Sequence, residues 1–186
     1  MKLAAVLYEK GEGAATDALL YGFALRLKRA GVRLAGAVQS NLPVANRSRC
    51  DITLEDLATG QRIKASDDRD RLAKGCRLDQ SALEDCVGIA VSSLEPDTDL
   101  VVINRFGKCE AEGRGFRPMI EQAVLLDVPV LVGLNRAHLE SWRTFVGEEP
   151  VLLPPELRAV SSWCAVNLSN CGPNVGLREN APVALT

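Results

Sequence analysis

Short apolar runs, separated by polar and glycine-containing turns, recur along this chain. Residues 3–8, 32–38, 99–104 and 129–134 are rich in Val, Leu, Ile and Ala and carry few charges. A run of this length bounded by turn residues is typical of a strand that is buried on both faces. A shorter run at residues 151–153 predicts an edge strand.

Amphipathic segments fall between these predicted strands. The first follows a turn at residues 11–15, carries apolar residues at helical spacing, and ends in basic residues that favour the helix dipole. Further helices are predicted to open at Asp79 and to cover residues 118–126, 137–146 and 155–166. Strands that alternate with helices predict a three-layer α/β/α sandwich with a mostly parallel sheet.

One segment departs from this alternation. From about residue 50 to residue 66 the chain alternates apolar and polar positions, turns, and returns, which predicts a β-hairpin inserted into the α/β core. We predict a single domain over residues 1–168, because 186 residues with 47% hydrophobic content suit one core. Residues 169–186 are rich in Asn, Gly and Pro and predict an irregular tail.

Charge and composition narrow the classes of partner. A net charge of −2 and 4% aromatic residues argue against nucleic acid and against an anionic membrane surface. No apolar run reaches the roughly 18 residues that cross a bilayer, and the apolar stretch at the N-terminus is too short for a signal peptide. We therefore expect a cytoplasmic protein that binds a small-molecule anion or a nucleotide. The sequence leaves homo-oligomerisation open.

The turn after the first predicted strand has the position of a P-loop with reduced chemistry. Gly11 and Gly13 could let backbone N–H groups close around an anion, and Thr16 supplies a hydroxyl at the start of the helix. An alanine stands where the phosphate-binding lysine would be, so the Walker A motif is degenerate. The alternative is a plain turn whose helix is capped by Thr16 or Asp17.

Two carboxylates in the same turn bear on the ligand. Glu12 and Asp17 add negative charge beside the predicted anion site. Like charges oppose a triphosphate there unless the carboxylates hold a metal or a cationic group.

A second candidate site follows the strand at residues 99–104. Asn104, Arg105, Lys108 and Glu110 cluster after this strand, and Gln39 ends the preceding one. The carboxyl ends of strands in an open α/β sheet are where ligands bind. Arg105 and Lys108 could neutralise an oxyanion while Glu110 orients them. The alternative is a solvated loop with internal ion pairs.

These motifs carry a family resemblance. Residues 104–113, 39–41 and 76–79 resemble signature segments of DUF2478, a bacterial family related to the THEP1-like P-loop nucleoside triphosphatases. Gly107 and Glu110 match the Walker B region of the THEP1-like proteins. The resemblance spans residue 3 to about residue 163 and implies a P-loop NTPase-like fold, without implying an established activity.

Departures from that pattern shape the functional hypotheses. Asn104 takes the place of the magnesium-binding Asp, and Arg105 takes that of the catalytic Glu. We therefore predict a nucleotide- or oxyanion-binding protein with weak or absent hydrolysis, and any cofactor would be magnesium carried with a nucleotide. An active NTPase with a rearranged catalytic set is the alternative, its cation supplied by Arg105 or Lys108.

A third hypothesis rests on the cysteines. The hairpin could bring Cys50 and Cys76 together near Cys109, which would suit a soft metal or a redox role. That arrangement would indicate a metal-handling accessory protein, and only the family resemblance implies its molybdate-related version. Unconnected free thiols are the alternative, since no CxxC pair is present.

Overall fold

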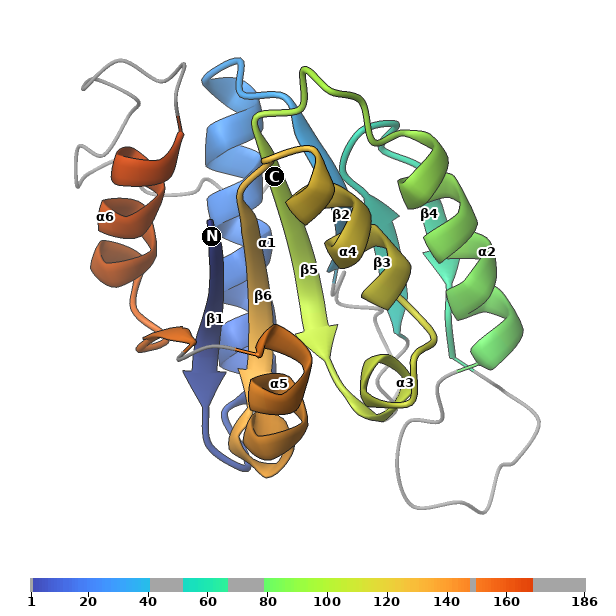
Figure 1. The fold of residues 1–186 in the computed structure, drawn as a ribbon. Coiled ribbons are helices and arrows are strands. Elements are labelled where there is room, and N and C mark those ends of the chain that lie inside the picture. The colour runs from blue at the N-terminus through green and yellow to red at the C-terminus, as the bar shows by residue number, and fades with distance from the viewer. Residues whose placement is uncertain (1, 41–51, 67–78, 148–149, 169–186) are drawn as a thin grey trace, which may run out of the picture.

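The computed structural model describes residues 2–40, 52–66, 79–147 and 150–168. Strands and helices alternate along most of this length, as Figure 1 shows. The strands are β1 (Leu3–Tyr8), β2 (Leu34–Gln39), β3 (Thr53–Asp56), β4 (Arg62–Lys64), β5 (Leu100–Phe106), β6 (Val130–Asn135) and β7 (Val151–Leu153). The helices are α1 (Gly13–Arg29), α2 (Gln80–Ser92), α3 (Lys108–Ala111), α4 (Arg117–Leu125), η1 (Arg136–His138), α5 (Leu139–Val146) and α6 (Leu157–Asn167).

Within the described residues, seven strands form one sheet in the order β4-β3-β2-β5-β6-β1-β7. The pairs β2–β5, β5–β6, β6–β1 and β1–β7 are parallel, whereas β2–β3 and β3–β4 are antiparallel. The mostly parallel sheet confirms the predicted fold class. The hairpin is also confirmed, and its pairing with β2 makes it a continuation of the sheet.

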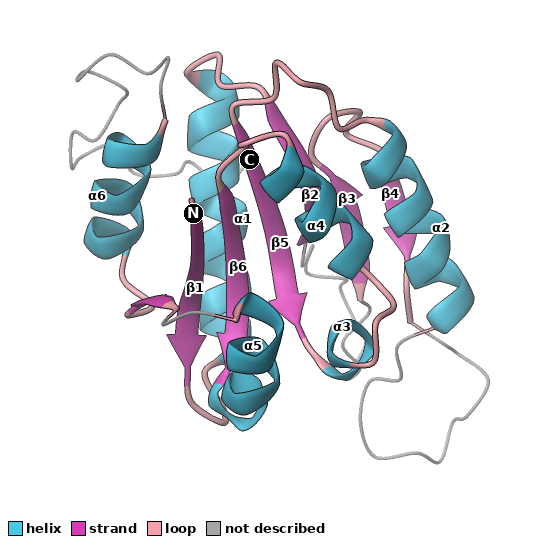
Figure 2. Ribbon diagram, viewed as in Figure 1, coloured by secondary structure: helices cyan, strands magenta, loops and turns pink. Residues whose placement is uncertain are grey.

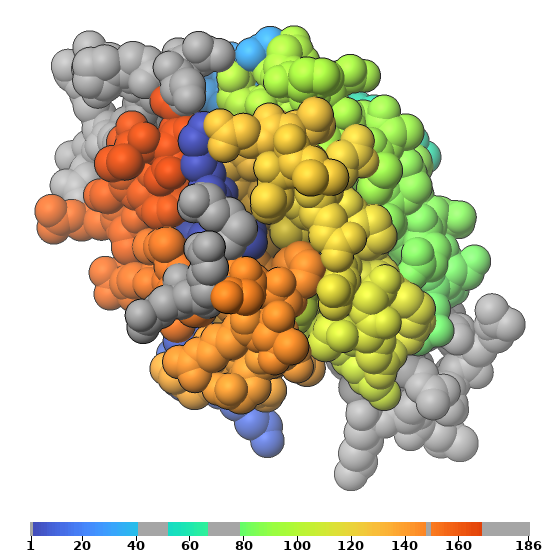
Figure 3. All heavy atoms as spheres, in the orientation of Figure 1, coloured from blue at the N-terminus to red at the C-terminus, as the bar shows by residue number. Residues whose placement is uncertain are grey.

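Helices cover both faces of the sheet, which gives three layers (Figure 2). Buried residues of α1 and α6 pack on one face together with the inward side chains of β1, β2 and β5. Buried residues of α2, α4 and α5 pack on the other face. The atoms of α2, α4 and α5 cover this second face in the space-filling view of Figure 3.

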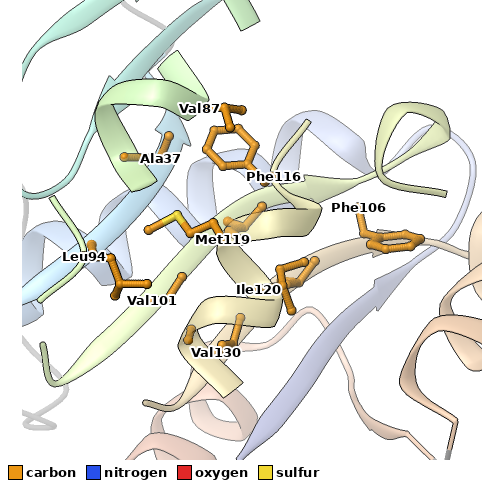
Figure 4. Close-up of a cluster of buried hydrophobic side chains, with 14 of the residues drawn as sticks. Ala37, Val87, Leu94, Val101, Phe106, Phe116, Met119, Ile120 and Val130 are labelled. Carbon is orange, nitrogen blue, oxygen red and sulfur yellow. The ribbon is translucent and has the colours of Figure 1, made fainter. Parts of the chain in front are cut away.

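The core on the second face is built mainly from aliphatic side chains, as the composition requires. Figure 4 shows Met119 and Ile120 of α4 directed toward Val101 and Val130 of the two central strands. Phe106 lies at the end of this cluster, with its ring centroid 5.0 Å from that of Trp142 in an edge-to-face arrangement. The central strands are fixed between two packed layers, so the loops at their ends are held in place.

Most element boundaries lie close to those predicted, with one difference that matters for function. The helix after β1 begins at Gly13, so Thr16 and Asp17 lie inside it and neither residue is its N-cap. The predicted tail at residues 169–186 lies outside the described residues. Among the helices that the structure does describe, none combines the length and the apolar character that crossing a bilayer demands.

Candidate functional site

The two predicted site segments meet at the carboxyl-terminal rim of the sheet. The loop after β1 leads into α1, and the end of β5 lies two strands away, with β6 between them. Because these strands are parallel, their carboxyl ends share one edge, where ligands of open α/β sheets bind. The side chain that spans the distance between the two segments is Arg105.

A β-bulge sets the direction of the polar side chains at the end of β5. Ile103 pairs with Val132 and Phe106 with Leu134, so β5 carries one more residue than β6 between these pairs. Asn104 and Arg105 of β5 therefore lie opposite the single residue Gly133 of β6. Successive side chains of a regular strand point to opposite faces, and a bulge can redirect one of them. As a result, both Asn104 and Arg105 reach toward α1.

Gly133 of β6 makes room for this bulge. A Cβ atom built on Gly133 would lie 2.2 Å from the carbonyl oxygen of Asn104, which is backbone and cannot move aside cheaply. The same atom would lie 3.2 Å from a methyl carbon of Leu20. A glycine at this position therefore allows β5 and β6 to approach where the bulge forms.

Asp17 is the acceptor on which the two β5 side chains converge. Its carboxylate accepts hydrogen bonds from Nε of Arg105 at 3.0 Å and from Nη2 of Arg105 at 2.5 Å. Nδ2 of Asn104 donates a third bond at 3.2 Å. The Asp17 side chain is 2% exposed and that of Arg105 is 45% exposed, so the pair joins a buried anion to a half-exposed cation.

The charge of Asp17 also stabilises the charged form of Arg105. Burial works to lower the pKa of the guanidinium, but the hydrogen bonds and the negative charge of Asp17 outweigh burial and raise this pKa. The sequence marks Asp17 as a carboxylate that opposes a triphosphate unless it holds a cation. In the structure it does hold a cation, the guanidinium of Arg105 from the same chain.

Arg105 lies against the first turn of α1. A Cβ atom built on Gly13 would be 3.1 Å from Nη2 of Arg105 and 3.6 Å from the ring of Tyr8. The two loops thus meet in direct contact through a polar head group, and no open cavity separates Gly13 from Arg105. Burial raises the pKa of Tyr8, an effect that the charge of Arg105 partly offsets. Sequence reasoning missed Tyr8, because it reads as the last residue of a buried strand.

Gln39 joins the same network from β2. Its backbone N–H donates to Oδ1 of Asn104 at 3.2 Å, and Nδ2 of Asn104 lies 3.5 Å from Oε1 of Gln39. The Asn104 amide is thereby engaged at both ends, by Gln39 and by Asp17. The structure brings together Gly13, Gln39, Asn104 and Arg105, four of the predicted site residues, and links them through Asp17.

The start of α1 lacks a side-chain cap. Glu12 is the N-cap residue, yet its carboxylate accepts the backbone N–H of Glu9 at 2.8 Å instead of capping the helix. The hydroxyl of Thr16 is buried and donates to the carbonyl of Glu12 at 3.1 Å. The capping alternative for Thr16 and Asp17 is therefore wrong. Gly11, at a φ of 100°, forms the left-handed turn before the helix.

Glu110 and Lys108 have partners away from this network. The buried carboxylate of Glu110 accepts the backbone N–H of Gly107 at 2.8 Å and that of Phe116 at 3.1 Å. It thereby clamps the two ends of the segment that contains α3. The side chain of Lys108 is 82% exposed, and its ammonium lies 3.7 Å from the Glu112 carboxylate. This part of the motif matches the alternative of a loop with internal ion pairs.

Metal ligation finds little support among the described residues. They contain no group of three or more His, Cys, Asp or Glu side chains that could hold a metal ion. Cys109 is half-buried, and burial followed by the charge of Glu110 raises the pKa of its thiol, which disfavours the thiolate that binds soft metals. The other two cysteines of that hypothesis, Cys50 and Cys76, lie outside the described residues.

A magnesium ion of the P-loop type also lacks free ligands here. Such an ion needs a hydroxyl from the start of the helix and a carboxylate at the Walker B position. The hydroxyl of Thr16 is bonded to the backbone, Asn104 offers only an amide that is already engaged, and Asp17 is neutralised by Arg105. The described residues at the rim therefore do not fit that ion in this conformation.

Comparison with solved structures defines the class of fold. A human cancer-related nucleoside triphosphatase aligns with a TM-score of 0.55 and 18% identity, over 81% of this chain and 88% of that one. THEP1 from Aquifex aeolicus aligns with a TM-score of 0.57 and 16% identity, over 90% of this chain and 97% of that one. The chain has the mixed α/β fold of the THEP1-like P-loop nucleoside triphosphatases.

Sequence comparison defines the family. The family profile described as "Protein of unknown function (DUF2478)" matches residues 3–163, and the chain belongs to this family. A curated relative, the molybdenum import ATP-binding protein ModC 2 of Bradyrhizobium diazoefficiens, is 35% identical over 164 residues. That match covers 87% of this chain but 18% of the relative, so the chain spans less than a fifth of that protein.

Proposed function

We propose that this chain binds an oxyanion, either free or as a phosphate group of a nucleotide, at the rim where α1 begins, with weak or absent hydrolysis. The observation that carries the proposal is the guanidinium of Arg105, which is held against the first turn of α1 by a buried carboxylate. A guanidinium and the positive end of a helix dipole are both partners that an oxyanion prefers.

The first turn of α1 has donors available for such a ligand. The first bond of the helix runs from the N–H of Thr16 to the carbonyl of Glu12, so the N–H groups of Gly13, Ala14 and Ala15 have no carbonyl within the helix to bond. Ala14 and Ala15 are exposed, and the N-cap contributes no side-chain acceptor. Arg105 adds the N–H groups that Asp17 does not accept.

The same geometry favours binding of an anion and disfavours hydrolysis of a nucleotide. Phosphoryl transfer by P-loop enzymes depends on a lysine at the phosphates, a metal held by hydroxyl and carboxylate, and a group that positions the nucleophile. An alanine replaces the lysine, and the side chains of Thr16 and Asn104 are engaged in bonds within the protein. An arginine where a catalytic carboxylate would stand cannot accept a proton from water.

Isothermal titration calorimetry with inorganic phosphate, sulfate, molybdate and ATP, with and without magnesium, tests this proposal. We expect Arg105→Gln to weaken binding of the preferred anion at least tenfold, or about 1.4 kcal/mol. Arg33→Gln is the matched control, because Arg33 forms a similar two-pronged ion pair with Asp99 at the opposite edge of the sheet. Equal losses in both variants, or no loss in either, would contradict the proposal.

An active NTPase remains the alternative that the fold favours. It predicts that phosphate release from ATP or GTP depends on Arg105. Release that survives Arg105→Ala at the wild-type rate would exclude the version in which this arginine supplies the catalytic cation.

A role in molybdenum import is a second candidate, favoured by the name of the curated relative. Molybdate is a tetrahedral dianion, so this role is compatible with an oxyanion site. Affinity for molybdate that exceeds affinity for phosphate and sulfate would support it. If cysteines hold a metal instead, the purified protein should contain that metal and lose it when Cys50 and Cys76 are replaced by Ser.

A further inference from the structure

The carboxylate of Asp17 has an unusual position for a residue beside an anion site. Its side chain is 2% exposed, and it accepts three hydrogen bonds, two from Arg105 and one from Asn104. A carboxylate is itself an oxyanion, and it engages the guanidinium through two N–H groups, as a phosphate oxygen pair would. Asp17 therefore occupies the face of Arg105 that an oxyanion ligand would otherwise bind.

The ion pair also determines where the guanidinium lies. With Nη2 only 3.1 Å from the Cβ position on Gly13, the head group rests against the turn in which the N–H groups of α1 begin. An anion that approaches Gly13 must lie beside this guanidinium or move it. Its half-exposed side chain leaves room for such movement on the solvent side.

We infer that Asp17 is a latch, which holds Arg105 across the free N–H groups of the first turn of α1. The latch releases the guanidinium when an anionic ligand replaces the carboxylate as its partner. This inference rests on the proposed function and adds regulation of the same site. The ligand and Asp17 compete for one guanidinium, so Asp17 weakens anion binding although it holds the residue that anions need. Anions that form strong bidentate bonds then have an advantage over weak ones.

Asn104 also contributes to the latch, because its side chain donates a hydrogen bond to the carboxylate of Asp17. The Asn104 amide is fixed by the backbone N–H of Gln39, so its Nδ2 group is directed at the carboxylate. When Arg105 leaves, Asn104 remains as a donor to the buried Asp17. The carboxylate therefore keeps one hydrogen bond, which lowers the free-energy cost of the open state.

The test measures the affinity for inorganic phosphate by calorimetry in four variants. Asp17→Asn preserves the shape of the side chain, removes its charge, and is expected to bind phosphate about tenfold more tightly than the wild type. Arg105→Gln is expected to lose at least tenfold. The double variant is expected to bind no more tightly than Arg105→Gln alone, because the gain acts through the released guanidinium. Asp99→Asn, which breaks the similar ion pair at the opposite edge, should leave the affinity unchanged.

The outcomes separate the latch from the proposed function. If Arg105→Gln loses binding while Asp17→Asn binds as the wild type does or more weakly, the site stands and the latch is overturned. If the double variant gains as much over Arg105→Gln as Asp17→Asn gains over the wild type, Asp17 acts by simple repulsion and the latch is again overturned. If neither the wild type nor Asp17→Asn binds inorganic phosphate, sulfate, molybdate or ATP, both proposals fail.

A measurement on the wild type keeps the latch testable if Asp17→Asn does not fold. The Nε–H signal of Arg105 in a nitrogen–proton correlation spectrum, assigned with Arg105→Lys, should shift as phosphate saturates the protein. The corresponding signal of Arg33 should stay in place. Phosphate binding that leaves the Arg105 signal unmoved would overturn the latch.

Discussion

Replacing Glu110 tests whether the most distinctive motif of the chain serves structure or ligand binding. Its buried carboxylate bonds the backbone N–H groups of Gly107 and Phe116, which lie on either side of α3. Charge-assisted hydrogen bonds contribute about 1.5 kcal/mol each, so Glu110→Ala should lower the free energy of unfolding by about 3 kcal/mol. For a domain of this size that corresponds to a melting temperature lower by about 6 to 12 °C. Glu110→Gln, which keeps one acceptor, should cost about half as much.

Urea denaturation followed by tryptophan fluorescence measures the stability, and calorimetry with phosphate measures binding in the folded variant. We expect Glu110→Gln to bind phosphate with the wild-type affinity, because its side chain is engaged by backbone groups away from the network around Asp17. Glu112→Gln is the control, since that carboxylate is exposed and its ion pairs contribute little. A Glu110→Gln variant that is as stable as the wild type but has lost phosphate binding would refute this reasoning.

Three further predictions concern other parts of the fold. Gly133→Ala should destabilise the protein by more than about 3 kcal/mol, measured by urea denaturation, because its Cβ would lie 2.2 Å from the backbone oxygen of Asn104. Burial, followed by the charge of Asp56, raises the pKa of the Cys86 thiol to about 12, whereas the same thiol titrates near 9.0 in the unfolded chain. The unfolded chain therefore loses this proton first, and the free energy of unfolding should fall as the pH rises above 9.0. At about pH 10.5 the wild type should have lost roughly 2 kcal/mol relative to Cys86→Ala, each compared with its own stability near neutral pH. Leu125 is 86% exposed, so Leu125→Lys should change the free energy of unfolding by less than about 0.5 kcal/mol.

The sequence predicts the layers of the fold well because burial leaves a direct mark on residue type. The apolar run at Leu3–Tyr8 became β1 with the predicted bounds, and Asp79 caps α2 by accepting the N–H groups of Ser81 and Ala82. Both features depend on residues that are close in the chain. The antiparallel hairpin followed equally from local alternation and a turn.

The sequence predicts where the candidate site lies in the sheet, but not which of its groups bond or contact one another. Parallel strands place Gly13 and Arg105 at one rim of the sheet, yet their direct contact depends on a bulge in β5. That bulge in turn depends on Gly133, a residue of another strand, so nothing near Arg105 in the sequence signals it. The sequence also does not reveal the partners of Glu110, because the backbone N–H of Phe116 approaches its carboxylate only after the loop has folded back.

The proposed anion site, which lacks the P-loop lysine, depends on the energetic balance between Asp17 and Arg105 at the rim. In a P-loop the bound phosphates supply the negative charge that the start of the helix favours. Here Asp17 supplies negative charge from within the chain, and Arg105 neutralises it. Removing one partner from a fully buried ion pair costs about 3 to 5 kcal/mol, which would weaken a competing ligand by more than about 100-fold. Because Arg105 is 45% exposed and Asn104 stays bonded to Asp17, the actual penalty must be smaller, near the tenfold effect expected for Asp17→Asn. A ligand must therefore compete with an internal carboxylate for the guanidinium of Arg105, while Asp17 stays in place and keeps its hydrogen bond from Asn104.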